Sequence, residues 1–101
     1  MDMEWAREEA KSIVKHGGLI AHPYSVRVDD WLGDGDFPKG IAIFVIKDGI
    51  FTYGCVTNHL IENYARKDNL DLYRYLRLVM KSLVKEIELK EAELAGNRSG
   101  I

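Results

Sequence analysis

Residues 41–56 read IAIFVIKDGIFTYGCV, two apolar runs joined at Asp48 and Gly49. Asp-Gly is a favoured pair for a two-residue type I′ turn, because both turn positions take a positive φ. We therefore predict a β-hairpin in which Lys47 pairs with Ile50. The rest of the register follows by counting outward from this pair.

This register sorts the hairpin side chains onto two faces, and both faces are apolar. One face carries Ala42, Phe44, Ile46, Phe51, Tyr53 and Cys55, and the other carries Ile41, Ile43, Val45, Ile50, Thr52 and Val56. An antiparallel sheet with one face in water normally alternates apolar and polar residues. The pattern therefore predicts a cover on each face. Phe44 and Phe51 are expected to be core residues if their shared face is the core face, and Cys55 is expected to be an inert buried thiol.

A third strand and a long loop are predicted before the hairpin. Within residues 19–28, apolar and polar residues alternate from Tyr24 onward, and Pro23 favours a strand start or an edge strand. Residues 29–40 contain three glycines and a proline, which is typical of a loop. Loops of this length are often functional.

Helical periodicity appears once before the sheet and twice after it. Residues 2–16 carry a narrow apolar stripe and stop before Gly17, a residue type that commonly ends helices. A short helix is expected over residues 58–67, capped by Thr57 or Asn58. A long helix with a broad apolar stripe is expected to follow it, up to Ala95.

Together these elements predict an α+β fold. It has an N-terminal helix, a small antiparallel sheet of about three strands with a central hairpin, and two C-terminal helices, the last one long. We expect a single domain over residues 1–95 and a flexible tail over residues 96–101. The three helices are expected to pack on one face of the sheet.

Composition limits the classes of partner. Sixteen acidic and fourteen basic residues give a net charge of -2, which provides no overall attraction to nucleic acid or to an anionic membrane. The longest apolar run, residues 41–46, is far shorter than the ~20 residues of a membrane helix. One cysteine cannot form an internal disulfide, which suits a reducing compartment. We expect a cytoplasmic protein that does not contact the membrane.

Catalytic motifs are not evident. No Cys/His zinc pattern, nucleophile elbow or phosphate-binding loop occurs, so we predict neither a metal nor a cofactor. Asp34 and Asp36 open an EF-hand-like spacing, but Pro38 breaks it. His22, which precedes a predicted strand, could line a cleft. A small enzyme with its site around His22 and the acidic loop 29–40 is therefore one alternative.

Apolar residues are the stronger candidates for partner binding. Trp31 and Phe37 are large aromatic residues in a polar loop, where they either anchor the loop to the core or form an exposed contact. Leu83 and Ile87 belong to the long helical stripe, which three helices and a small sheet are not expected to bury completely. We therefore predict a non-enzymatic binding or regulatory module that acts as a homo-oligomer, in its simplest form a homodimer.

A basic ridge on the long helix supports a second alternative, nucleic-acid binding. It comprises Arg74, Arg77, Lys81 and Lys85. Like charges one helical turn apart repel by a few tenths of a kcal/mol, so negative groups near the ridge are needed to compensate for this repulsion. Carboxylates of a partner, the chain's own glutamates or nucleic-acid phosphates would supply them, and neighbouring Tyr73 and Tyr75 could stack on bases.

Overall fold

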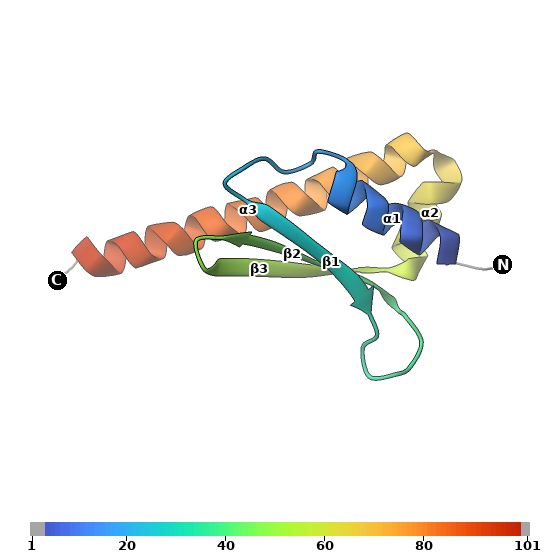
Figure 1. Ribbon diagram of the computed structural model, residues 1–101, viewed down its shortest axis with the longest axis horizontal. Helices are drawn as coiled ribbons and strands as arrows, with labels where there is room; N and C mark the ends of the chain where they lie inside the picture. Colours follow the sequence, from blue (N-terminus) through green and yellow to red (C-terminus); the bar gives the residue numbers. More distant parts are fainter. Residues whose placement is uncertain (1–3, 100–101) are drawn as a thin grey trace.

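A three-stranded antiparallel sheet with its strands in the order β1-β2-β3 forms the centre of the structure. The computed structural model describes residues 4–99, apart from the side chains of Asn69 and of residues 97–99. Its elements are α1 (Glu4–His16), β1 (Ser25–Trp31), β2 (Gly40–Lys47), β3 (Ile50–Thr57), α2 (Asn58–Lys67) and α3 (Asn69–Ser99) (Figure 1). The predicted α+β fold and element order are confirmed.

The predicted hairpin turn is confirmed in its details. Asp48 has a φ of 50° and Gly49 a φ of 80°, as a type I′ turn requires. Lys47 pairs with Ile50, and Phe44 pairs with Tyr53 further along the two strands. The division of β2 and β3 into the two predicted faces follows directly from this register.

β1 is longer than the sequence pattern suggested. It begins after the cis His22–Pro23 peptide bond and continues to Trp31, so the prediction of a loop from Asp29 was wrong. Asp29 and Asp30 pair with Ala42 and Ile41 of β2, and this backbone pairing overrides the weak strand preference of aspartate. The connecting loop therefore spans residues 32–39, and β1 is an edge strand.

All three helices contribute to a core on one face of the sheet. Ile41, Ile43 and Val45 of β2 are completely buried on that face. The helices cover them with Ala6, Ala10, Val14, Ile61, Leu72, Leu76, Met80, Leu83 and Ile87. The expectation that the helices pack on a single face is confirmed.

The helices after the sheet begin as expected, but the last one ends later. The Thr57 hydroxyl caps α2 by accepting a hydrogen bond from the amide of Leu60. α3 continues through Ser99, so the predicted helix end at Ala95 was wrong, and residues 96–99 are helical. Residues 100–101 of the predicted tail lie outside the described residues. The end of α3 extends past the sheet in Figure 1, and the molecule measures 57 × 30 × 17 Å.

Candidate binding surfaces

The second face of the sheet is not covered by the helices, and we refer to it as the open sheet face. Phe51 is 55% exposed and Tyr53 is 61% exposed. The open sheet face comprises Ser25, Arg27, Asp29, Trp31, Ala42, Phe44, Ile46, Phe51, Tyr53 and Cys55. The predicted division of the hairpin into two faces is right, but Phe44 and Phe51 are not core residues of this chain.

Aromatic side chains form the middle of the open sheet face. The ring centroids of Phe44 and Tyr53 lie 5.9 Å apart, within the range of favourable aromatic contacts. Arg27 and Asp29 form an ion pair of 2.9 Å on the edge strand beside them. Cys55 is exposed, which contradicts its predicted burial. The face is thus apolar at its centre and polar along one margin.

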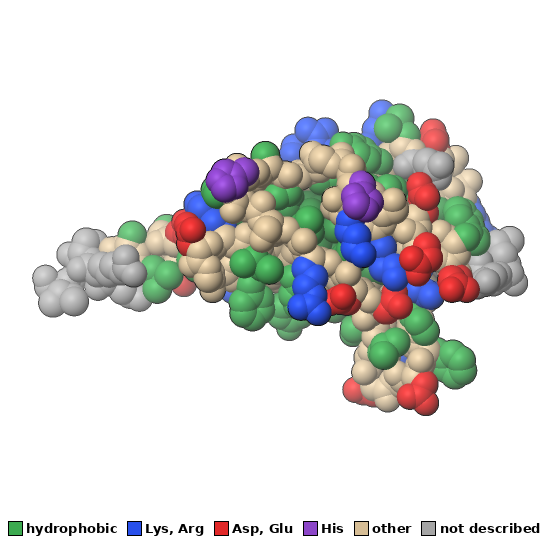
Figure 2. Space-filling view, in the orientation of Figure 1, with side chains coloured by type: hydrophobic (Ala, Val, Ile, Leu, Met, Phe, Trp, Pro, Cys, Tyr) green, Lys and Arg blue, Asp and Glu red, His purple; other side chains and the backbone are tan. Residues whose placement is uncertain are grey.

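Trp31 lies at one end of this face, and Phe37 belongs to the loop that follows Trp31. Trp31 is half-buried and shares the side of the sheet on which Phe44 lies. Phe37 is 83% exposed in the loop that projects from the body, where Figure 2 shows hydrophobic side chains beside acidic ones. The base of the loop is held by Asn58, whose Nδ2 donates to the carbonyl of Pro38 at 2.8 Å. Phe37 therefore does not anchor the loop to the core, and its side chain is exposed.

Leu83 and Ile87, the other two partner-binding candidates, belong to the core. Leu83 is 4% exposed and Ile87 is completely buried, because α3 lies directly against β2 and β3. Neither side chain forms part of a free surface. The prediction that these two residues lie on an uncovered part of the long helix was therefore wrong. Exposed apolar residues occur elsewhere, on the sheet at Phe51 and Tyr53 and on α3 at Leu78 and Leu89.

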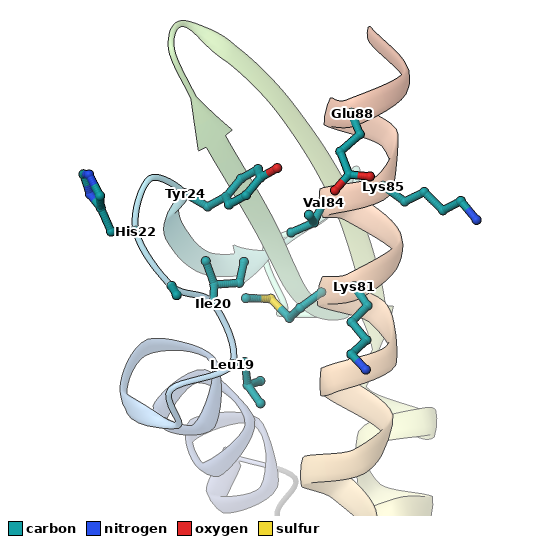
Figure 3. Close-up of a pocket in the computed structure, with 10 residues that line it drawn as sticks. Leu19, Ile20, His22, Tyr24, Lys81, Val84, Lys85 and Glu88 are labelled. Carbon is teal, nitrogen blue, oxygen red and sulfur yellow. The ribbon is translucent and has the colours of Figure 1, made fainter. Parts of the chain in front are cut away.

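A cleft lies between α3 and the segment that joins α1 to β1. Its volume is about 550 Å³, and its lining is Leu19, Ile20, Ala21, His22, Tyr24, Met80, Lys81, Val84, Lys85 and Glu88. Figure 3 shows Ile20 and Tyr24 facing Val84 across the cleft. Sequence reasoning identified His22 as a possible cleft residue but did not find the helix that forms the opposite wall.

The two parts of the predicted enzyme site are not brought together. Figure 3 shows the His22 side chain pointing away from the cleft. His22 precedes β1 and the loop follows it, so the seven residues of the strand separate them by roughly 23 Å. Among the described residues, no three His, Cys, Asp or Glu side chains are grouped closely enough to hold a metal ion.

Asp29 and Asp30 are engaged in ion pairs on opposite faces of β1. Asp29 pairs with Arg27, whereas Asp30 contacts Lys11 at 2.9 Å and Arg7 at 3.3 Å. The hydrogen bond from Lys11 lowers the pKa of Asp30 below its usual range. The Asp30 carboxylate therefore joins β1 to α1, whereas the Asp29 pair lies within β1. Neither carboxylate converges with Asp34 and Asp36 on a common metal site within the described residues.

The basic ridge is exposed on α3. Arg74 lies 3.9 Å from Asp71, whereas no ion pair connects Arg77, Lys81 or Lys85 to any described residue. The chain's own glutamates therefore do not compensate for the repulsion among these three basic side chains. Lys81 and Lys85 stand at the mouth of the cleft, so the structure joins a predicted cationic surface to an apolar hollow.

The tyrosines beside the ridge make contacts within the chain. The Tyr73 hydroxyl lies 3.3 Å from the carbonyl of Gly17, to which it donates a hydrogen bond. The ring of Tyr75 stacks on that of Tyr64 with the centroids 4.4 Å apart. Burial, together with Tyr64, raises the pKa of Tyr75. The Tyr75 ring is thus already stacked within the chain, and the Tyr73 hydroxyl is held by the loop after α1.

No protein family, curated protein or solved structure matches the chain. Within residues 4–99, no helix has the length and apolar character needed to cross a membrane.

Proposed function

We propose that this protein is a non-enzymatic binding or regulatory module that acts as a homodimer, with the open sheet face as its interface. The observation that carries the proposal is the exposure of Phe51 and Tyr53 on a sheet face without a helix over it. A cytoplasmic location is part of the proposal, and an exposed cysteine without a disulfide partner supports it.

The size of the apolar patch supports an interface. An aromatic side chain can bury about 150–250 Å². Phe51 and Tyr53, each more than half exposed, thus leave roughly 200 Å² in water, and Phe44, Ile46, Ala42 and Cys55 add to it. Soluble monomers rarely expose contiguous apolar patches beyond a few hundred Å². Covering this patch would therefore be favourable.

A second copy of the chain fits this face better than a strongly charged partner. The Arg27–Asp29 ion pair balances the charge at its margin, so two copies would meet without net repulsion. Sheets pack face to face at about 10 Å, and a two-fold axis brings one patch against its own copy. A stable interface buries about 800 Å² per partner. Trp31 and the projecting loop with Phe37 lie next to the patch and would extend the contact toward that size.

Analytical ultracentrifugation tests the homodimer. At micromolar concentration we expect about twice the 11.5 kDa mass of the chain. Tyr53→Asp should give a folded monomer, because a charge in the middle of the interface would lose its hydration. Leu78→Asp is the matched control, since Leu78 is 66% exposed on α3 and lies outside the patch. A wild-type monomer throughout this concentration range would refute the proposal.

Cys55 provides a second measurement. Its thiol is exposed in the single chain and would be covered in the proposed dimer. Its rate of reaction with a thiol reagent should therefore fall as protein concentration rises through the dissociation constant, and Tyr53→Asp should restore fast reaction. A reaction rate independent of concentration in a dimeric sample would place the interface elsewhere.

Nucleic-acid binding by the basic ridge is the second candidate. Arg77, Lys81 and Lys85 form no ion pair with the described residues, which supports it, whereas the stacking of Tyr75 on Tyr64 argues against base stacking by Tyr75. Binding of a labelled duplex should then weaken steeply with salt, since each phosphate contact releases a counterion. Duplex binding without salt dependence, or no binding at low salt, would eliminate this candidate.

A further inference from the structure

The cleft between α3 and residues 19–24 has the form of a small-molecule site. Its volume of about 550 Å³ lies within the range of drug-sized ligand sites, roughly 300–1,000 Å³. Ile20, Met80 and Val84 give it an apolar wall on each side. Figure 3 shows the Tyr24 ring closing one part of it. An aliphatic chain placed there would leave water along most of its length.

The two lysines at the mouth of the cleft form no ion pair with any described residue. Lys81 and Lys85 stand one helical turn apart, about 6 Å along the axis, and both line the cleft. Each repels its like-charged neighbour, and no described carboxylate pairs with either. Lys85 extends away from the cleft in Figure 3, but the rotatable bonds of its side chain allow the ammonium to reach the mouth.

The opposite end of the cleft does not suit an anion. Lys47 does not line the cleft, but its Nζ lies 5.3 Å from the centre of the ring of Tyr24, which does, and 3.0 Å from Glu91. Its hydrogen bond to Glu91 raises the pKa of Lys47, so this cation already has a partner. Glu88, which lines the cleft and forms no ion pair with a described residue, adds a negative charge on the same side. An anionic group in the cleft is therefore directed toward Lys81.

We propose that the cleft binds a medium- or long-chain aliphatic carboxylate, with its chain between Ile20 and Val84 and its carboxylate beside Lys81 and Lys85. Two ammonium groups one turn apart match the two oxygens of one carboxylate. A nucleic-acid backbone would contact the cations but leave the apolar walls unused. A neutral lipid would occupy the space between the apolar walls and leave the cations unpaired.

Calorimetric titration with octanoate, decanoate and dodecanoate below their micelle concentrations tests the proposed contact between the aliphatic chain and the apolar walls. Affinity should rise about fourfold for each added methylene group that enters the cleft. Decanol, which has the same chain as decanoate without the charge, should bind at least tenfold more weakly than decanoate. An affinity independent of chain length, or equal for decanol and decanoate, would overturn the proposal.

Paired variants test the location. Lys81→Gln combined with Lys85→Gln should lower decanoate affinity at least tenfold and leave decanol affinity unchanged. Val84→Thr, which has nearly the same shape, should weaken both ligands severalfold. Arg74→Gln is the matched control, because Arg74 belongs to the ridge but not to the cleft. An equal effect of Arg74→Gln, accompanied by competition from a DNA duplex, would assign the cations to nucleic acid.

Tyr53→Asp separates this proposal from the proposed dimer. Decanoate could also adsorb to the open sheet face, in which case Tyr53→Asp would abolish binding and the cleft variants would not. That outcome would overturn the cleft site. If Tyr53→Asp keeps decanoate affinity, the cleft proposal stands whether or not the chain is a dimer.

Discussion

The Oγ1 hydroxyl of Thr52 donates a hydrogen bond to the main-chain carbonyl of Leu83 at 3.0 Å, joining the covered face of β3 to the middle of α3. Thr52 is 2% exposed, so water cannot replace this bond. Thr52→Val keeps the shape and removes the donor. We expect it to lower the free energy of unfolding by about 1 kcal/mol in a urea titration. An unchanged stability would mean that the bond contributes nothing to the packing of α3 on the sheet.

Gly40 and Gly54 provide a matched pair on β2 and β3. A Cβ added to Gly40 would lie 1.9 Å from the carbonyl oxygen of Val56, whereas one added to Gly54 would meet Leu83 at 3.6 Å, an ordinary contact. Gly40→Ala should therefore destabilise the fold by about 2 kcal/mol or more, and Gly54→Ala should be neutral or stabilising by up to about 1 kcal/mol. Denaturant unfolding of both variants measures the difference, and the reverse order would contradict the strand register.

The hairpin turn predicts a second contrast. Gly49 has a φ of 80°, a region that a β-branched residue resists. Gly49→Val should therefore destabilise the protein more than Lys47→Ala, which removes only the partly buried ion pair with Glu91. Thermal unfolding followed by circular dichroism compares them. Equal melting temperatures would argue against the type I′ turn.

Asp30 should contribute to acid sensitivity. The hydrogen bond from Lys11 lowers its pKa in the folded protein below 3.8, so the ionised carboxylate favours the folded state. This contribution is complete above the unfolded pKa and is lost as pH falls through the folded pKa. Asp30→Asn should lower stability at pH 7 by at most about 1 kcal/mol, because the pair is partly in water. In urea titrations, the difference in free energy of unfolding between wild type and Asp30→Asn should shrink below pH 3.8. A difference that grows there would contradict the lowered pKa of Asp30.

Substitutions at core and at surface positions of α3 should differ clearly in their effect on folding. Leu83→Glu or Ile87→Glu would place a charge among completely packed side chains, at a cost of roughly 3 to 5 kcal/mol or more. We expect loss of the folded circular dichroism spectrum, and not a folded monomer. Leu78→Asp, at an exposed position of the same helix, should keep it. A folded Leu83→Glu protein would mean that α3 does not pack against β3 as described.

The hairpin was largely determined by local sequence. Asp48 and Gly49 fixed the turn, and the turn fixed which side chains share a face, because strand side chains alternate with a period of two. The cap at Thr57 was likewise a local property, since a hydroxyl at that position bonds an amide three residues away. Such features depend on a few neighbouring residues and could be predicted.

The open sheet face was predictable only in part. The pattern showed that both faces of the hairpin are apolar, and that one set of helices would not cover both. It did not show which face the helices would cover, because Phe44 and Ile43 are equally suited to burial. The fold chose the face with Ile43, where branched side chains pack against α3, and left Phe44 and Tyr53 outside.

Only the tertiary structure decided where the candidate sites lie. Ile20 and Val84 are sixty-four residues apart in the sequence and face each other across the cleft. Periodicity placed Leu83 and Lys81 on the long helix correctly but could not say that the first is buried and the second borders a hollow. By itself, the sequence determined turns, caps and helix faces, which arise from short-range sterics and hydrogen bonds. Contacts between distant segments depend on how those faces pack together, and they decided which surfaces remained free to bind.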